Sequence, residues 1–162
     1  MFNFKVESYL KVVFVISLLS IISASFIEYV LGHQPCNLCI IERIPYGLSI
    51  ILISINYMFK KNEKFIISLL ILIFIFSFSI SFYHFGIEQG FFEESAVCNL
   101  KNTSDVRSKA ELLQLLNEKT ISCKDVTFRI FGLSLTSINI VISLIITIML
   151  IKIYNTYEKI KL

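Results

Sequence analysis

Charged residues are scarce in this sequence. Only 17% of its 162 residues are Asp, Glu, Lys or Arg, and it has just two prolines and five glycines. A soluble domain would carry about a quarter charged residues. Hydrophobic residues make up 56% of the chain instead, and the mean hydropathy is +0.76. This surplus of Ile, Leu and Phe is too large for one soluble core, so an ordinary soluble domain is excluded and a lipid environment is predicted.

Other features are missing as well. The net charge of +3 is too small to indicate a nucleic-acid partner. The chain has no internal repeats and no low-complexity segments. We therefore expect residues 1–162 to form a single integral membrane domain.

Four long apolar stretches are present instead. An α-helix of roughly 20 residues crosses a hydrocarbon core of about 30 Å. Such stretches are expected to be helical in lipid, because a helix satisfies its own backbone hydrogen bonds. The second stretch is short unless residues 39–43 extend it, and Pro45 suits its first turn. The sequence predicts an all-α membrane protein, a bundle of four transmembrane helices at about residues 12–31, 44–59, 65–85 and 133–154.

The first stretch could also be a cleaved signal peptide. Lys5 and Lys11 precede it, and Ser23–Ser25 loosely resembles a cleavage site. The apolar run nevertheless continues to Val30 and is longer than a typical signal core. We expect a retained membrane helix.

Lysine placement predicts the orientation. Both ends of the chain and the turn around residues 60–64 carry eight lysines against three acidic residues, whereas residues 86–132 carry six basic and seven acidic ones. By the positive-inside rule, both termini face the cytoplasm, and residues 32–43 and 86–132 form two periplasmic loops. The expected location is a bacterial inner membrane, crossed several times, with every cysteine on the oxidising side.

The long loop contains its own helical signal. Ser108–Glu111 fits a capping box, and leucines at 112, 113, 115 and 116 give an apolar stripe. A short helix on the membrane surface and a helix packed onto the loop itself are equally compatible with this pattern.

Cys36 and Cys39 form a C-x-x-C motif at the outer mouth of the second span. Two intervening residues let both sulfurs share one turn, and a helix N-terminus lowers the pKa of a thiol there. Zinc sites and structural bridges also use this motif, and a zinc ion would take Cys98 and Cys123, or His33 and His84, as its other two ligands. A four-cysteine zinc site commonly repeats the close spacing, however, and Cys98 and Cys123 are 25 positions apart. We therefore expect no metal, and a pair of purely structural disulfides stays an alternative.

Cys98 and Cys123 lie in the long loop, flanked by charged residues, and we expect this pair to be exposed to a protein partner. Thiol–disulfide exchange requires such access. One exposed pair and one pair at the membrane surface make a plausible electron relay. Electrons would pass from a partner protein to Cys98–Cys123, then to Cys36–Cys39, and finally to a lipid-soluble two-electron acceptor such as a quinone.

Arg43 is four residues after Cys39, one helical turn deeper on the same face. A cation at the edge of the hydrocarbon needs a partner or a task. Its predicted task is to stabilise negative charge on Cys39 or on the bound acceptor. The alternative is that it pairs with Glu42 or Glu28, or reaches the lipid headgroups.

His84 ends the third span on the same outer side. A contact with the quinone and an ordinary satisfied hydrogen bond are equally supported for this residue. Glu88 and Gln89, just beyond it, are expected to be solvated loop residues.

Several of these segments together resemble one family over nearly the whole chain, the disulfide bond formation protein B (DsbB) family. The Pro-Cys-x-x-Cys-x-x-x-Arg element within this topology is the specific signal. The segments that carry the resemblance are Gln34–Arg43, Tyr83–Glu88, the two loop cysteines and Phe131–Ser134.

The resemblance implies a protein-disulfide oxidoreductase with catalytic Cys36, Cys39, Cys98 and Cys123. A reduced DsbA-like periplasmic protein of thioredoxin fold would attack Cys98, and the released Cys123 would attack Cys36. Cys39 would then face ubiquinone or menaquinone drawn from the membrane pool. Arg43 would favour the charged state of Cys39, and His84 would lie near the quinone.

Two other functions compete with this interpretation. A vitamin K epoxide reductase-like quinone reductase also combines four helices with two cysteine pairs, but there the quinone-proximal C-x-x-C follows the loop pair, and here it precedes it. A disulfide-stapled membrane scaffold without enzymatic activity would leave Arg43 without a task.

Overall fold

The computed structural model describes residues 2–59, 63–94, 98, 123–124, 129–130 and 132–161 of the chain. Helix α1 spans Phe2–Tyr29, and the short α2 (Asn37–Ile41) is followed after two residues by α3 (Ile44–Phe59). Helix α4 spans Glu63–Glu88, and α6 spans Leu135–Lys161. Four spans within these helices are long and apolar enough to cross a membrane, with α2 and α3 together making the second. The all-α, four-helix membrane architecture expected from the sequence is therefore confirmed.

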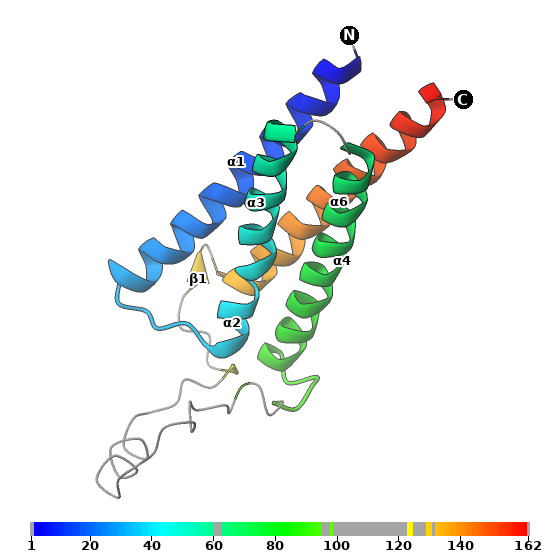
Figure 1. The fold of residues 1–162 in the computed structure, drawn as a ribbon. Helices are drawn as coiled ribbons and strands as arrows, with labels where there is room; N and C mark the ends of the chain where they lie inside the picture. The colour runs from blue at the N-terminus through cyan, green and yellow to red at the C-terminus, as the bar shows by residue number, and fades with distance from the viewer. Residues whose placement is uncertain are drawn as a thin grey trace, which may run out of the picture.

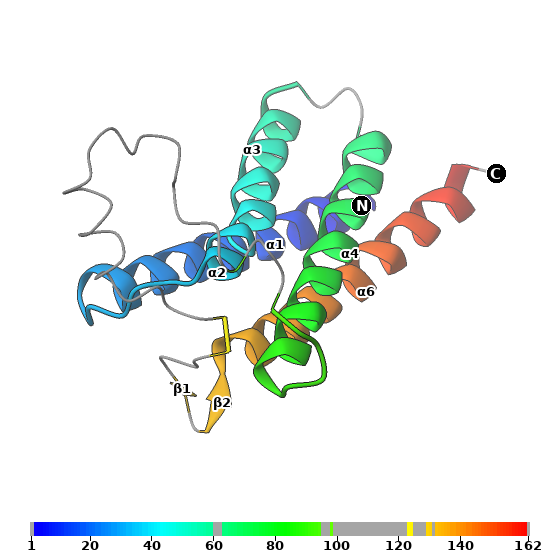
Figure 2. The ribbon, with the colours of Figure 1, turned by 90° about the horizontal axis from the view of Figure 1, so that it is seen from below.

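Several helix ends differ from the expected ends of the spans. α1 begins at Phe2, well before the apolar stretch, because Lys5, Glu7 and Lys11 continue the helix and the last two form an ion pair one turn apart. At the other end of the chain, Leu133–Ser134 is strand β2, paired antiparallel with β1 (Arg129–Ile130), so α6 begins only at Leu135. Gly132, in the turn of this hairpin, has a φ of 83°, a backbone conformation that glycine adopts more readily than other residues. Figure 2 shows β2 leading directly into α6.

The bundle has two distinct ends (Figure 1). The two chain ends lie together at one of them, where α3 ends and α4 begins. The segment that joins α1 to α3, including α2, lies at the opposite end, as do the last turn of α4 and the start of α6. We call this second end the cysteine end.

The core runs between the helices along most of the bundle. α4 packs most extensively against α6, α3 packs against α1 and α4, and α1 and α6 touch only sparsely. Apolar side chains such as Ile53, Leu70 and Phe74 are completely buried in it. Buried hydroxyls add cross-links between helices, from Ser49 to Ser17 and between Ser77 and Ser143. Such small polar contacts are typical of helix packing in lipid.

Candidate redox site

The C-x-x-C motif begins α2. Cys36 is the N-cap residue, and its sulfur accepts a hydrogen bond from the backbone N–H of Cys39 at 3.2 Å. This turn brings the two Sγ atoms to 2.6 Å from each other. Both cysteines are free thiols, with Cys36 buried and Cys39 half-buried. The sequence expectation that both sulfurs share one turn agrees with this geometry.

The surroundings of Cys36 favour its thiolate. The hydrogen bond with the Cys39 thiol is the largest cause, and contact with the His84 ring adds to it, while burial acts in the opposite direction. Together they lower the pKa of Cys36 to about 5. A thiol with so low a pKa is ionised at neutral pH and is a good leaving group in thiol–disulfide exchange.

Cys98 and Cys123 are joined as a disulfide, with their Cα atoms 5.7 Å apart. The expectation that this pair is exposed is wrong, since Cys98 is 4% and Cys123 2% exposed. The physical reason is apolar packing: both belong to one buried cluster with Cys36, Leu38 and Ile87. The fold thus packs the loop disulfide beside the first cysteine of the C-x-x-C motif.

A cavity of about 460 Å³ opens on the other side of the motif. It lies between α1, α3 and α6, and its lining includes Cys39 but not Cys36. The exposed surface of the cavity is mostly apolar, and its polar lining residues are Ser20, Ser23, His33, Gln34, Glu42, Arg43, Tyr46, Thr136 and Asn139. Pockets for small organic ligands have this size and this mixture of apolar walls with few polar groups. The residues therefore fit a quinone headgroup beside the sulfur of Cys39.

Arg43 lines this cavity and also pairs with a carboxylate. Its Nη1 donates to Oε2 of Glu28, which comes from the last turn of α1. Of the pairing alternatives left open by the sequence, the structure shows the one with Glu28. Pairing and lining are compatible, because a guanidinium has five N–H donors and Glu28 takes only some of them.

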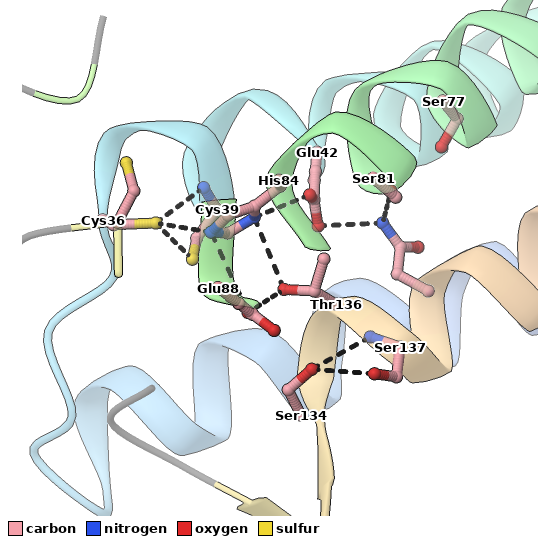
Figure 3. A network of polar contacts seen from close by, with 12 residues as sticks. Cys36, Cys39, Glu42, Ser77, Ser81, His84, Glu88, Ser134, Thr136 and Ser137 are labelled. Atoms are coloured by element: carbon pink, nitrogen blue, oxygen red, sulfur yellow. Dashed lines mark hydrogen bonds and ion pairs between the residues drawn. The ribbon is translucent and has the colours of Figure 1, made fainter. Parts of the chain in front are cut away.

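His84 is almost fully buried, at 2% exposed, and lies between two side chains of the motif segment (Figure 3). Its Nε2 is 3.6 Å from Cys36 Sγ, and its Nδ1 is 2.9 Å from Oε1 of Glu42. The described residues that line the cavity do not include His84. The imidazole therefore contacts the sulfur that faces the loop disulfide, while the carboxylate of Glu42 reaches the cavity.

Glu88 was expected to be a solvated loop residue, and this is wrong. It is the last residue of α4, and its side chain is only 6% exposed. Its Oε1 accepts a hydrogen bond from Thr136 Oγ1 and lies 4.0 Å from His84 Nε2. α4 continues one turn past His84, which carries Glu88 inward on the same helix face.

Among the described residues, one cluster of side chains could hold a metal ion, and it combines the C-x-x-C pair with one of the two histidines considered from the sequence. Donor atoms of Cys36, Cys39 and His84 lie within 4.8 Å of one another, and two sulfurs with one imidazole would suit a thiophilic ion. Cys98 and Cys123 are bonded to each other, so their sulfurs are not available as two further ligands.

The sequence did not single out Glu42 or Glu88 as site residues. The signal that could have found them was present, because carboxylates beside or within apolar spans are rare and mark functional sites. Glu42 was considered only as a partner for Arg43, and Glu88 was placed beyond the end of its helix. The sequence also did not indicate Asn139 of α6, whose Nδ2 donates a hydrogen bond to Oε2 of Glu42 at 3.0 Å.

Comparison with known proteins agrees with this geometry. The profile of the family described as "Disulfide bond formation protein DsbB" matches residues 7–153. An uncharacterised protein of Rickettsia prowazekii (strain Madrid E) is 29% identical over 142 residues, which cover 86% of this chain and 82% of the relative. No solved structure matches the chain.

Proposed function

Because the chain belongs to the DsbB family of disulfide bond formation proteins and is thus a membrane-embedded disulfide oxidoreductase, we propose that it passes electrons from a periplasmic protein to a quinone. The electron donor is a reduced DsbA-like protein of thioredoxin fold. The relay residues are Cys98, Cys123, Cys36 and Cys39, and Arg43 holds the quinone end of the site. The protein is placed in a bacterial inner membrane with its cysteine end facing the periplasm.

One observation carries this proposal: of the two cysteines of the C-x-x-C motif, only Cys39 lines the cavity. Cys36 is a member of the buried cluster that holds the Cys98–Cys123 disulfide, and Cys39 packs against the edge of that cluster. A relay needs one sulfur that exchanges with the incoming disulfide and one that faces the final acceptor. The two sulfurs are also only 2.6 Å apart, so the pair can close to a disulfide when its electrons leave.

The chemistry proceeds by successive exchange. The partner thiolate attacks Cys98, and the bond from Cys98 to Cys123 breaks. The Cys123 thiolate then attacks Cys36 of an oxidised Cys36–Cys39 pair, and Cys39 leaves as the thiolate. The second thiolate of the partner attacks the sulfur that joins the partner to Cys98, which releases the oxidised partner. The freed Cys98 thiolate attacks Cys123, so the Cys98–Cys123 bridge re-forms and Cys36 and Cys39 are left as the reduced pair. A bound quinone supplies the oxidising power, accepting two electrons and two protons. Arg43 stabilises negative charge beside Cys39 from its place in the cavity wall.

The test is a reconstituted assay. Purified protein in detergent receives a reduced thioredoxin-fold dithiol protein and a short-chain ubiquinone or menaquinone analogue, and quinone reduction is followed by absorbance. We expect turnover by the wild type and none by Cys39→Ser. A protein that keeps both disulfides through the incubation and reduces neither quinone would be a stapled scaffold, and zinc bound in stoichiometric amount would indicate a metal-binding protein instead.

A further inference from the structure

We propose that His84 and Glu42 form a proton relay, which carries the proton of the Cys36 thiol to the cavity beside Cys39. This inference rests on the proposed quinone reduction and deepens it by adding Glu42 as a catalytic residue. A relay is needed because the two thiols differ in their access to the cavity. The Cys39 thiol can give its proton directly into the cavity, but Cys36 is not part of the cavity wall.

The imidazole of His84 is placed to accept that proton. Nε2 faces Cys36 Sγ at 3.6 Å, and Nδ1 faces Glu42 Oε1 at 2.9 Å. An ionised carboxylate only accepts hydrogen bonds, so Nδ1 carries a hydrogen and Nε2 of the neutral ring is free to take one. A proton taken up at Nε2 can therefore be matched by release of the proton on Nδ1 to Glu42.

Glu42 connects the ring to the cavity. It lies in the two-residue turn between α2 and α3, is 8% exposed, and is one of the residues lining the cavity. Its second oxygen accepts a hydrogen bond from Asn139 Nδ2, which holds the carboxylate between α4 and α6. Figure 3 shows the resulting chain from Cys36 through His84 to Glu42.

The other groups that face the ring come from α4 and α6. Glu88 Oε1 is 4.0 Å from Nε2, and Thr136 Oγ1 is 3.4 Å from Nδ1 while it donates to Glu88. The second oxygen of Glu88 is buried and has no hydrogen-bond partner among the described residues. Two carboxylates thus flank one imidazole, and both attract a proton to the ring.

A purely structural role explains this arrangement less well. Burying an imidazole and two carboxylates at the edge of a membrane is costly, and neutral hydrogen-bonding residues could cross-link the same helices at lower cost. Carboxylates and histidine are the side chains that exchange protons near neutral pH.

The balance of the reaction fits the relay. Oxidation of the reduced Cys36–Cys39 pair forms one S–S bond and releases two electrons and two protons, which together would convert a bound quinone to the quinol. One proton comes from the Cys39 thiol and enters the cavity directly. The other is the proton that Cys36 gives up when its thiolate forms: it passes to His84 Nε2, the Nδ1 proton passes to Glu42, and Glu42 releases a proton into the cavity.

Glu42→Gln is the decisive variant, because glutamine keeps the size and the hydrogen bonds of the side chain but cannot carry the proton. The matched control is Glu7→Gln, a carboxylate near the opposite end of the bundle paired with Lys11. Two readouts are needed. The first, without quinone, is the pH dependence of Cys36 alkylation in protein carrying Cys98→Ser and Cys123→Ser, read by tandem mass spectrometry. The second is single-turnover reduction of a ubiquinone analogue by the reduced protein.

We expect Glu42→Gln to move the alkylation midpoint of Cys36 upward by about 1 pH unit, because the ring loses the carboxylate that favours its cation. We expect the single-turnover rate at pH 7 to fall about 100-fold, the usual size of a general acid–base contribution. Glu7→Gln should match the wild type in both readouts. If Glu42→Gln does not fold, His84→Gln takes its place, with the same two expectations.

The outcomes separate the relay from the proposed function. If the wild type reduces quinone and the variant matches it in either readout, the relay is overturned and the function stands. If the wild type does not reduce quinone at all, the proposed function fails and the relay fails with it. Changes in both readouts, absent from Glu7→Gln, support the relay.

Discussion

The guanidinium of Arg43, in the wall of the cavity, is paired with the carboxylate of Glu28 in the last turn of α1. Both side chains are partly buried, at 28% and 22% exposed, so the pair closes the outer end of α1 onto the start of α3. This pairing gives Arg43 a structural role in addition to the electrostatic role proposed for it. Variants of Arg43 test the electrostatic role through quinone reduction, and a variant of Glu28 tests the structural role through stability.

Arg43→Ala should slow quinone reduction about 10- to 100-fold and raise the apparent KM for quinone, because the cavity loses its only cation among the described residues. Attack of the partner on Cys98 should be unaffected, since it involves the other cysteine pair. Arg43→Lys should retain part of the activity, as it keeps the charge but loses the planar donor fork. The measurement is steady-state quinone reduction in proteoliposomes at varied quinone concentration. If Arg43→Ala has the wild-type rate and KM, the only role of Arg43 is to hold α1 near the start of α3 through its pair with Glu28.

Glu28→Gln should lower stability. It leaves the Arg43 cation without its ion-pair partner in a partly dry setting, and we expect a loss of about 1–2 kcal/mol, less than for a fully buried pair. Thermal unfolding in detergent measures this, with Glu7→Gln as the control, because the exposed Glu7–Lys11 pair should contribute little. Equal unfolding temperatures for the two variants would mean that the Arg43–Glu28 pair does not stabilise the fold.

Cys123→Ala should accumulate a mixed disulfide between Cys98 and the partner protein. The attack on Cys98 still occurs, but no neighbouring thiol is available to resolve the adduct. Cys98→Ala should give no such adduct. Non-reducing gels with the dithiol partner separate these cases, and an adduct through Cys36 instead would reverse the order of the steps.

Alkylation of Cys36 in the reduced wild type should reach its full rate by neutral pH. The pKa of Cys36 is lowered to about 5, so the thiolate fraction and with it the rate should rise through pH 5 and be flat by about pH 7. In the unfolded protein the same thiol should titrate near its ordinary pKa of about 8.5. A folded-state midpoint near the unfolded one would contradict the stabilisation of the Cys36 thiolate.

Topology is tested by reporter fusions. The lysines at 60, 61 and 64 predict that Asn62 faces the cytoplasm and that Asp105 faces the periplasm. A periplasmic signal at Asn62 would place the cysteine end on the reducing side and would remove the basis for the disulfide chemistry.

Hydropathy was enough to predict the four helices, because each must satisfy its backbone within lipid and so appears as a long apolar run. It could not predict the end of α4 at Glu88 or the β1–β2 hairpin, since these depend on packing at the cysteine end. The short helix predicted at residues 108–116, on the membrane surface or packed onto the loop, lies outside the residues that the structure describes.

The site was predicted unevenly for a related reason. The motif spacing placed Cys36 and Cys39 on one turn, but the burial of the loop disulfide comes from the packing of distant segments, which bring Cys123 and Ile87 into one buried cluster. The contact of Glu42 with His84 likewise joins residues 42 positions apart. Only the packing of α4 against the α2–α3 turn reveals it.

The separation of the two motif sulfurs has a consequence for the direction of flow. Cys36 belongs to the cluster with Cys98 and Cys123, Cys39 packs against that cluster, and of the two motif cysteines only Cys39 lines the cavity. A reduced product in the cavity would therefore meet Cys39, whereas Cys36, Cys98 and Cys123 are not among the described residues that line it. In the proposed orientation, burial also keeps small thiols of the periplasm away from the Cys98–Cys123 bridge, whereas a docking protein has binding energy available to open the packing around it. The buried Cys98–Cys123 bridge would then accept electrons from a docking protein and not from small thiols.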